Sequence, residues 1–426
     1  MLGDRTDERQ HSASFSWAAW PEPVPCRKPA QSLEAPADPD PSGVKIVVDA
    51  LHSREGGGRS FLVNSIRAWL DLEEARDDVL ILLTSDVPLA DAFRTEQRVK
   101  TIFARELPVP LRLLAGTFRG QYLLKRFDAD ILYCPGNFGP LVQFRSKTVI
   151  TLQNPHYFTT RRYQFSRWIR WRLNVERAIS EYTLRRADLV VAISHSLATE
   201  ACGTIGLKNL RVIPSGGNTR FLEGASVPQR EEGEFLAGCP FILCVNNLYE
   251  HKATELIVDA CALAWPNAGQ RLPLVIVGGE VHPMARRRLQ RAQDASGYPV
   301  VRLTRVDRDL LSQLYEAAAL YISASMAEAY PLTPGEAASF GTPTVLSDIA
   351  PHREVLPNAA FFEPGNAVAA AEVIRRMVPL PQSGALGMRK SASPRPLGRD
   401  GNDWTWCDQA AELRNCMVSL LANDKR

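Results

Sequence analysis

Short apolar runs alternate with segments of helical periodicity along most of the chain. In the first half, the runs that predict strands are Val44–Ala50, Val79–Leu83, Asp130–Cys134, Lys147–Leu152, Leu189–Ile193 and Leu210–Ile213. A second series of such runs continues at Phe241–Val245, Leu274–Val277, Val300–Leu303, Leu320–Ile322 and Thr344–Leu346. Because alternating strands and helices build a parallel sheet with helices on its faces, the two series predict two doubly wound α/β domains.

Segments without a clear period divide the chain. We expect a disordered N-terminal extension over residues 1–43, because this stretch is rich in Pro, Ala, Ser and Asp. A first Rossmann-like domain is predicted over residues 44–220 and a second over residues 221–403, where a polar loop ends it. Residues 404–426 close the chain with a predicted helix, roughly Trp404–Leu421.

Composition narrows the class of protein. With 426 residues, 45% of them hydrophobic and 23% charged, the chain has the size and balance of a two-domain globular protein. A net charge of +3 gives no argument for nucleic acid binding. No apolar run approaches the ~18 residues that span a bilayer, and the first residues lack the apolar core of a secretion signal. Eight scattered cysteines without a C-x-x-C pair are typical of reduced thiols, so we expect a cytoplasmic protein.

The most informative motif is the stretch E-A-Y-P-L-T-P-G-E, from Glu328 to Glu336. It follows the predicted strand Leu320–Ile322, and the carboxyl end of a parallel strand is where α/β proteins bind ligands. Thr333 and Glu336, with Pro334 at the first helical position, also fit a capping box at a helix N-terminus. The capping box accounts for Glu336 alone and leaves Glu328 as a candidate ligand-binding carboxylate.

A glycine cluster lies between the first predicted strand and a helix predicted from about Ser60; it comprises Gly56, Gly57 and Gly58. Without Cβ atoms, the backbone N–H groups there can approach an anion or a sugar, and the helix N-terminus favours negative charge. The cluster matches neither the dinucleotide fingerprint nor the Walker loop. It predicts either a ligand contact or a tight turn from strand to helix.

Lys252 follows the predicted strand Phe241–Val245 and comes near the start of the next predicted helix. A cation at a helix N-terminus opposes the macrodipole by ~0.3–1 kcal/mol, and that cost disappears when an anion such as a diphosphate binds with it. The alternative is a solvated lysine, with Glu250 and Glu255 screening its unfavourable interaction with the helix macrodipole.

The triplet Asp128-Ala129-Asp130 matches the D-x-D pattern of metal-dependent sugar transferases. It directly precedes a strand that reads as buried, so a junction between helix and strand explains it better. We therefore expect no metal site.

The segment Arg161–Arg172 combines five arginines with an apolar stripe of Phe165, Trp168, Ile169 and Leu173. A basic amphipathic helix with tryptophan suits an anionic membrane surface or a lipid-phosphate acceptor. The alternative is an ordinary core helix with a solvated arginine face.

Taken in order along the chain, these motifs resemble those of the retaining GT-B fold glycosyltransferases of family 4, also called glycosyl transferases group 1. The resemblance covers most of residues 44–421 and consists of the glycine loop, the strand Ala187–Ser194, the crossover Val212–Asn218, the Lys252 loop, the strand Leu274–Gly278, the E-x7-E motif Glu328–Glu336, the turn Gly341–Pro343 and Trp406. Such proteins have two Rossmann-like domains that face each other across a cleft. The resemblance implies a metal-independent hexosyltransferase that moves a sugar from a UDP- or GDP-linked donor to a saccharide or lipid-linked acceptor, in polysaccharide or glycolipid synthesis.

The resemblance also implies a role for each matching residue. Lys252 would neutralise the donor diphosphate, Glu328 would contact the transferred sugar, and Glu336 would accept hydrogen bonds from the ribose hydroxyls. The further donor-binding residues would be Asn247, Val306, Ala329, Tyr330, Pro331 and Leu332. The acceptor side of the cleft would be lined by Gly56, Gly57, Gly58, Gln153 and Asn154.

Two positions depart from the family pattern. Gln153 and Asn154 stand where family members often have His-Asp, and Asn247 stands where they often have arginine. Gln153 cannot titrate, and Asn247 removes one positive charge from the diphosphate site. These departures favour a rival hypothesis, a nucleotide-sugar-binding partner subunit without catalysis, whereas the intact lysine and two glutamates favour an enzyme. An epimerase of the same architecture would need acid and base residues that the sequence does not supply.

Overall fold

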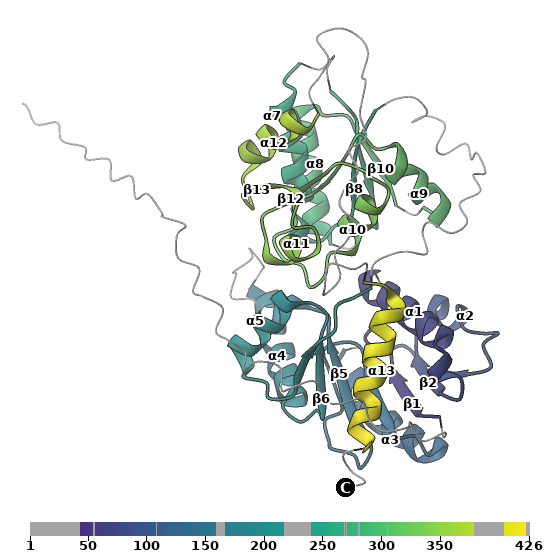
Figure 1. Ribbon diagram of the computed structural model, residues 1–426. Helices are drawn as coiled ribbons and strands as arrows, with labels where there is room; N and C mark the ends of the chain where they lie inside the picture. The colour runs from purple at the N-terminus through teal and green to yellow at the C-terminus, as the bar shows by residue number, and fades with distance from the viewer. Residues whose placement is uncertain are drawn as a thin grey trace, which may run out of the picture. The chain divides into compact units, whose positions relative to one another are not determined.

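The computed structural model describes residues 43–53, 56–107, 109–158, 167–216, 240–267, 269, 271–279, 282–304, 306–378 and 404–422. These residues build two parallel sheets, each with helices between its strands (Figure 1). The fold class predicted from the sequence is confirmed. Almost all of the predicted N-terminal extension, residues 217–239 around the predicted domain boundary and residues 379–403 before the last helix lie outside the described residues.

The first sheet contains seven strands in the order β3-β2-β1-β4-β5-β6-β7, with every neighbouring pair parallel. Its strands are β1 (Lys45–Asp49), β2 (Val79–Thr84), β3 (Val99–Phe103), β4 (Ile131–Cys134), β5 (Lys147–Leu152), β6 (Leu189–Ala192) and β7 (Leu210–Val212). The helical elements between them are α1 (Gly56–Asp71), η1 (Glu73–Ala75), α2 (Val87–Asp91), α3 (Val109–Phe127), η2 (Pro155–Tyr157), α4 (Arg167–Leu184) and α5 (His195–Ile205). The strand order reverses between β1 and β4, and right-handed crossovers then place α3 and α4 on one face of the sheet and α1 on the other.

The second sheet contains six parallel strands in the order β10-β9-β8-β11-β12-β13. Its strands are β8 (Ile242–Val245), β9 (Leu274–Val277), β10 (Val300–Leu303), β11 (Leu320–Ser323), β12 (Thr344–Ser347) and β13 (Ala360–Phe362). Its helical elements are η4 (Glu250–Lys252), α7 (Thr254–Ala264), α8 (Pro283–Ser296), α9 (Arg308–Ala317), α10 (Leu332–Ser339), α11 (Ala350–Val355) and α12 (Ala367–Met377). The chain then ends in α13 (Trp406–Ala422).

Local signals set several of the helix ends. Ser194 caps α5 by accepting a hydrogen bond from the Leu197 N–H at 3.1 Å, and Gly206 ends the helix at a positive φ of 68°. Pro283 stands at the start of α8, where its missing N–H costs nothing, and Gly297 follows its end at a φ of 58°. These positions carry the residue types that helix termini favour.

Two strands were not predicted from the apolar pattern, and one helix begins earlier than predicted. β3 and β13 are edge strands with only one residue each fully buried, so they lack the continuous apolar run of a central strand. The first helix begins at Gly56 rather than near Ser60, and the glycine cluster therefore forms its first turn.

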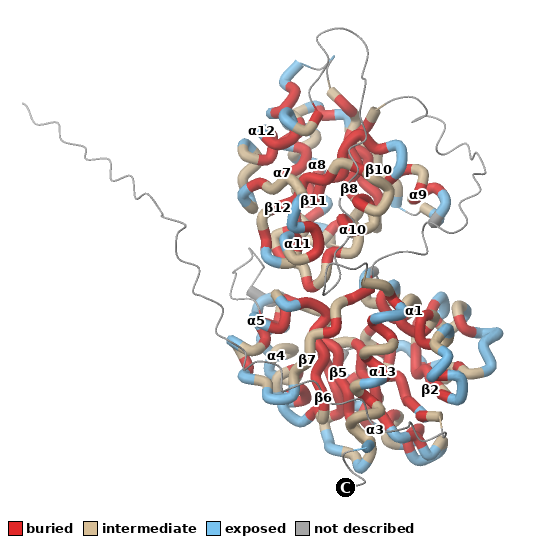
Figure 2. Tube along the Cα trace, in the orientation of Figure 1, coloured by how far each residue is buried: buried red, intermediate tan, exposed pale blue. Residues whose placement is uncertain are grey.

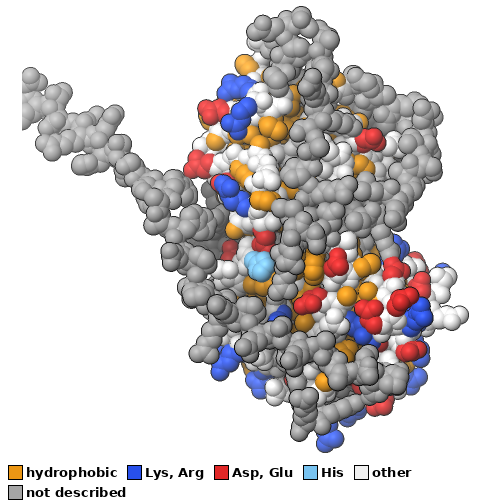
Figure 3. Space-filling view, in the orientation of Figure 1, with side chains coloured by type: hydrophobic (Ala, Val, Ile, Leu, Met, Phe, Trp, Pro, Cys, Tyr) orange, Lys and Arg blue, Asp and Glu red, His pale blue; other side chains and the backbone are white. Residues whose placement is uncertain are grey.

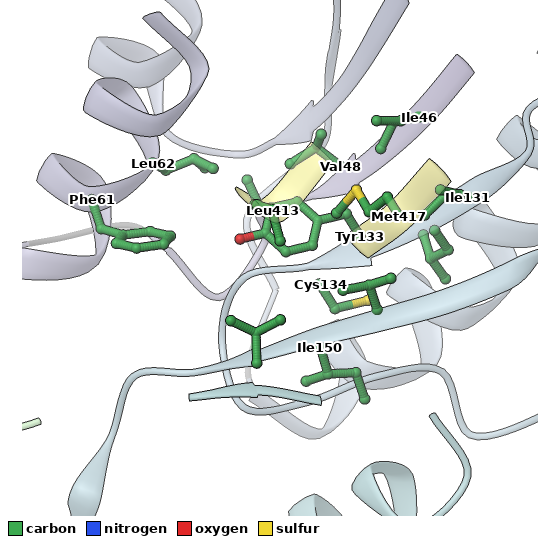
Figure 4. Packing of buried hydrophobic residues seen from close by; sticks show 14 of the residues in the cluster. Ile46, Val48, Phe61, Leu62, Ile131, Tyr133, Cys134, Ile150, Leu413 and Met417 are labelled. Carbon is green, nitrogen blue, oxygen red and sulfur yellow. The ribbon is translucent and has the colours of Figure 1, made fainter. Parts of the chain in front are cut away.

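The helix α13 packs on the first sheet, although it follows the second in sequence. Leu413 and Met417 of α13 lie against Ile46 and Tyr133 in the buried cluster shown in Figure 4. These side chains leave a cavity of only about 20 Å³, which is far too small for a sugar. Figure 2 shows the same pattern more widely, with buried strands inside and exposed residues on helices and turns.

A buried ion pair fastens α13 to the same region. Arg414 donates to both oxygens of Asp78 at 2.8 and 3.1 Å. Trp69 Nε1 and the Val44 backbone N–H donate to the same carboxylate, so the buried charge has both a counterion and further hydrogen bonds. Elsewhere, on the face drawn in Figure 3, acidic and basic side chains of the described residues are interspersed.

Candidate active site

A lysine and a glutamate from adjacent strands of the second sheet meet at its carboxyl edge. Lys252 ends η4, which follows β8, and Glu328 lies in the loop after β11. β8 and β11 are parallel neighbours, so the loops that follow them emerge side by side. Lys252 Nζ donates to Glu328 Oε1 at 2.5 Å, and the two side chains are 19% and 15% exposed.

The surroundings of Glu328 keep its carboxylate ionised. Burial alone would raise the pKa of this carboxyl group, but the Lys252 ammonium, His352 and a hydrogen bond from Ser325 outweigh burial and lower the pKa below its ordinary value of 4.5. The site therefore presents a fixed anion beside a fixed cation. Such a pair can orient a polar, charged ligand.

His352 is a site residue that the sequence reasoning missed. It is fully buried in α11, and its Nδ1 donates to the Ser347 carbonyl at 2.8 Å. Burial lowers the pKa of His352 below its ordinary value of 6.5, although the nearby Glu328 carboxylate acts against this shift. Its Nε2 is buried and has no hydrogen-bond partner among the residues that the structure describes. Ser347 Oγ in turn donates to the Ser325 carbonyl at 2.5 Å, and this contact fixes the start of the Glu328 loop.

Glu336 is held by a buried tyrosine and does not form the predicted capping box. The helix α10 begins at Leu332 with Pro331 at its N-cap and no side-chain cap, so the capping-box interpretation is wrong. Instead, Tyr315 Oη donates to Glu336 Oε2 at 2.7 Å. Burial and the Glu336 charge both raise the pKa of Tyr315, which therefore stays a hydrogen-bond donor.

Both glutamates act on one buried side chain, Tyr321 of β11. Its pKa is raised, mainly by burial, with smaller contributions from Cys244, Glu328 and Glu336. Its hydroxyl forms a hydrogen bond with Thr333 Oγ1 at 2.8 Å. The Thr333 side chain therefore contacts Tyr321 and does not cap the helix. The E-x7-E motif thus places two carboxylates around the end of a single strand.

Asn247 stabilises the turn after β9. Its Oδ1 accepts a hydrogen bond from the Gly279 N–H at 2.8 Å. The neighbouring Gly278 has a φ of 147°, and a Cβ there would lie only 1.9 Å from the Asn246 carbonyl oxygen, so only glycine fits. The amide at position 247 therefore holds the backbone of a loop near Lys252 in the chain.

The loop after Glu328 contacts both halves of the molecule. The Ala329 carbonyl accepts a hydrogen bond from Ser194 Oγ at 2.6 Å. Tyr330 packs against the buried clusters of both sheets, and Leu332 packs against that of the first. Val306 is partly buried just before α9, whose N-cap is Asp307.

On the first sheet, the glycine cluster and Gln153 are brought together. A Cβ on Gly58 would lie 3.4 Å from Gln153 Oε1, whereas one on Gly57 would have open space around it. Gln153 Nε2 is buried and has no hydrogen-bond partner in the described part of the chain. By contrast, Asn154 caps η2 by accepting from the His156 N–H at 3.0 Å, so its side chain has a structural partner.

Two further histidines lie beside the lysine. The rings of His156, which follows β5, and His251, which precedes Lys252, have centroids 4.4 Å apart in an edge-to-face arrangement. Burial and the Lys252 charge lower the pKa of His156 to about 4 and that of His251 well below 6.5. Both imidazoles are therefore neutral at neutral pH. Sequence spacing gave no reason to group them.

The carboxyl edge of the first sheet also contains a desolvated acid. Burial raises the pKa of Asp49 to about 6, although the Leu51 N–H and Arg119 act against this shift. The helix α3 passes close over this carboxylate, because a Cβ on Gly116 would lie 2.5 Å from Asp49 Oδ2.

The remaining sequence candidates have structural contacts. Asp130 Oδ2 accepts from the Lys45 N–H at 2.9 Å, which supports the interpretation of the D-x-D triplet as a junction. No group of three or more metal-ligating side chains occurs in the described residues. Within the predicted basic segment, residues 161–166 and the side chains of residues 167–169 lie outside the described part of the structure. Leu173 packs against the core as predicted, and Trp171 is 63% exposed.

Similarity to solved structures defines the fold. A glycosyltransferase from Rickettsia africae shares 16% identity with a TM-score of 0.66 over 90% of this chain and 100% of that one. Sucrose-phosphate synthase from Thermosynechococcus elongatus shares 18% identity with a TM-score of 0.68, over 89% and 100%. HepE from Anabaena in complex with UDP-glucose shares 15% identity with a TM-score of 0.62, over 89% and 96%. The molecule therefore has the GT-B fold of glycosyltransferases.

Family models identify the family. The model described as Glycosyltransferase Family 4 matches residues 56–221, and the model described as Glycosyl transferases group 1 matches residues 228–390. Together the models cover most of the chain, which belongs to this family and is a glycosyltransferase. No curated protein sequence matches the chain. None of the described helices is long and apolar enough to cross a membrane.

Proposed function

We propose that this enzyme transfers a hexose from a UDP- or GDP-linked donor to a saccharide or lipid-linked acceptor, with retention of configuration. The reaction would take place in the cytoplasm and serve polysaccharide or glycolipid synthesis. The observation that carries the proposal is the contact between Lys252 and Glu328 at the carboxyl edge of the second sheet. The family supports a sugar-transfer reaction. The similarity to HepE, which was solved with UDP-glucose, supports a nucleotide-sugar donor.

The leaving diphosphate gains negative charge as the glycosidic bond breaks, and a fixed cation stabilises that charge most in the transition state. Lys252 would supply this cation. An ammonium has three donors, so it can hold Glu328 and a phosphate oxygen together. This role for Lys252 is our reason for proposing a reaction without a metal ion.

Glu328 would orient the transferred sugar by accepting hydrogen bonds from its hydroxyls. The lowered pKa keeps this carboxylate an acceptor throughout the neutral range. Glu336, held by Tyr315, would accept from the ribose. The backbone from Ala329 to Leu332 would line the sugar site, with Asn247 and Val306 on the nucleotide side.

The acceptor would approach from the first sheet. Gly56, Gly57 and Gly58 offer a first helical turn without side chains, and Gln153 Oε1 is close to Gly58. We propose that Gln153, whose amide nitrogen lacks a partner among the described residues, donates to an acceptor or sugar hydroxyl. Asn154 would act indirectly, since its side chain caps η2.

A second candidate function is a nucleotide-sugar-binding subunit that lacks catalysis. The observation that favours it is the contact of Asn247, whose amide oxygen binds the Gly279 backbone where the family often has an arginine. A subunit of this kind would bind the donor through Lys252 and transfer nothing.

Slow hydrolysis of the donor distinguishes the two functions. The protein is incubated with a panel of UDP- and GDP-hexoses, and nucleotide release is measured for the wild type and for Glu328→Ala. Glu363→Ala, which removes an exposed carboxylate next to β13, is the matched control. We expect release with one donor, a large loss in Glu328→Ala and none in the control. Binding without release, with or without acceptors, would favour the non-catalytic subunit.

A further inference from the structure

The helix α3 exposes a row of large apolar side chains. Leu111, Leu114, Phe118 and Tyr122 recur every three or four residues, which places them on one face of the helix. Phe118 is 68% exposed and Tyr122 is 59% exposed. Large apolar residues scattered singly over a surface are ordinary, but a continuous helical face of them indicates a partner.

The helix α4 repeats this pattern. Trp171, Val175, Ala178 and Tyr182 lie on one exposed face, at spacings of three or four residues. Trp171 is 63% exposed and Tyr182 is 44% exposed. This face is distinct from the side of the helix that packs through Leu173 and Ile179 against the core.

One loop bridges the two helices, beside Phe118 of α3 and at the last residue of the α4 row. The Leu141 N–H donates to Thr117 Oγ1 of α3 at 3.0 Å, and Tyr182 Oη of α4 donates to the Leu141 carbonyl at 3.3 Å. The next residue, Val142, is itself 51% exposed. Since right-handed crossovers also place α3 and α4 on one face of the first sheet, we treat the two rows and Val142 between them as one surface. We call it the α3–α4 surface.

Basic side chains end both rows in the same way. Tyr122 is followed by Lys125 and Arg126, and Tyr182 is followed by Arg185 and Arg186, all exposed. The Arg186 guanidinium lies 4.6 Å from the Tyr182 ring, and Arg126 donates to Tyr122 Oη at 3.4 Å.

Few acidic groups oppose this positive charge. The helix α3 contains no acidic residue. In α4, Glu181 pairs with Arg185 at 2.7 Å, and Glu176 accepts a hydrogen bond from Tyr157. Arg172 pairs with Glu176 at 3.5 Å, and the exposed Arg170 adds one further positive charge beside the apolar row.

We propose that the α3–α4 surface binds an anionic membrane surface, with the apolar rows in the interface and the basic side chains on lipid phosphates. Aromatic and aliphatic side chains gain free energy by entering the headgroup boundary, and Trp and Tyr favour this depth. Each lysine or arginine near an anionic leaflet adds about 1 kcal/mol. A positive, apolar and aromatic surface is complementary to such a leaflet. If the proposed function holds, this contact delivers a lipid-linked acceptor to the first sheet.

Vesicle sedimentation with the full chain tests the proposal. The probes are phosphatidylcholine vesicles with and without phosphatidylglycerol. We expect binding only to the anionic vesicles, weakened by salt. The double variant Phe118→Ser/Trp171→Ser and the double variant Arg126→Gln/Arg186→Gln should each reduce the partition coefficient roughly tenfold or more. All four positions are exposed, so the variants should fold.

Matched controls come from α12, which also carries an exposed apolar residue and an exposed basic pair. Val368→Ser and Arg375→Gln/Arg376→Gln should bind vesicles like the wild type. Equal loss in these controls, unchanged binding in the α3–α4 variants, or no binding of the wild type would overturn the proposal. So would a wild-type dimer in sedimentation velocity that Phe118→Ser/Trp171→Ser dissociates, because the surface would then bind a second copy. Donor hydrolysis without vesicles should be unchanged in every variant, which separates this test from that of the proposed function.

Discussion

Two partly buried carboxylates lie at the carboxyl edges of the two sheets, and their surroundings shift their pKa values in opposite directions. Asp49 ends β1, and burial raises its pKa to about 6. Glu328 follows β11, where burial acts in the same direction but Lys252, His352 and Ser325 outweigh it and the pKa falls. The cation at 2.5 Å makes the difference.

The two pKa shifts distinguish a carboxyl group that burial favours in its protonated form from one that its neighbours favour in its ionised form. A group that must accept hydrogen bonds from a sugar at neutral pH has to be ionised without a ligand, and Glu328 meets that condition. Asp49 meets it only above its raised pKa. Burial alone therefore does not identify a site residue, and the buried Asp78–Arg414 pair shows that a paired cation can also be purely structural. Glu328 is a candidate because its ion pair lies at the carboxyl edge of parallel strands.

The largest effect is expected from Lys252→Ala. The substitution removes the cation from the diphosphate site and leaves Glu328 buried without its partner, so donor turnover should fall at least ~100-fold. Nucleotide release from the preferred donor measures this. Lys147→Ala is the matched control, because Lys147 is 18% exposed and pairs with Asp188 at 3.8 Å in the first sheet. A similar loss of turnover in the control would contradict the account.

Asp49→Asn sharpens the comparison through stability. Because the pKa is raised, the folded protein favours the protonated carboxyl group. Ionised Asp49 therefore lowers the free energy of unfolding above pH 6, and this destabilisation is absent below the ordinary pKa of 3.8. The amide should therefore raise the free energy of unfolding by about 1–3 kcal/mol at pH above 6. That gain should vanish as the pH falls towards 4. Urea denaturation at both ends of this range measures it, and a gain independent of pH would contradict the assignment.

Glu336→Gln tests whether the second carboxylate binds the donor. A hydrogen bond to a charged acceptor is stronger than one to a neutral acceptor, so the dissociation constant of the donor should rise roughly five- to tenfold. Tyr315→Phe, which removes the hydrogen bond to Glu336 Oε2, should have a smaller effect in the same direction. Tyr298→Phe is its control, since Tyr298 Oη donates to the Leu272 carbonyl at 2.7 Å away from these carboxylates. Calorimetric titration measures the dissociation constant of the donor. The same dissociation constant in all three variants would exclude a role for Glu336 in donor binding.

The smallest effects are expected at two neighbouring side chains on the first sheet. Gln153→Met removes an amide whose buried nitrogen has no partner among the described residues, so the free energy of unfolding should rise by up to about 1 kcal/mol while transfer slows. Asn154→Ala removes the cap of η2 and should lower stability by about 1 kcal/mol. Transfer by Asn154→Ala should stay close to that of the wild type. Melting and activity assays measure both effects. Slower transfer by Asn154→Ala together with unchanged transfer by Gln153→Met would contradict the roles proposed for the two residues.

Central strands could be predicted from the sequence because their apolar runs are continuous. The central strands β5 and β9 have the predicted bounds, while the edge strands β3 and β13, with one fully buried residue each, carry no such run. The Glu328–Glu336 motif could be found because its spacing lies within one loop. Its contact with Lys252 is between residues 76 positions apart, and it follows only from the pairing of β8 with β11.

Other parts of the site depend on tertiary structure that spacing does not reveal. His352 is a buried imidazole that acts electrostatically on Glu328. His156 lies beside His251 only once both sheets have formed. Glu336 was ambiguous because a local capping box competes with a distant tyrosine, and the start of α10 at Leu332 decides between them. The exposed face of α4 includes Trp171, which the predicted stripe left out because a single helix gives no sign of which side the core covers.

The central claim is that Lys252 and Glu328 bind different parts of one nucleotide-sugar. It is tested most directly by calorimetric titration of the preferred donor, and of its free nucleoside diphosphate, into the wild type, Lys252→Met and Glu328→Gln. We expect Lys252→Met to weaken the binding of both ligands, whereas Glu328→Gln should weaken only that of the nucleotide-sugar. Equal weakening of both ligands by Glu328→Gln, or wild-type binding of both by Lys252→Met, would contradict it.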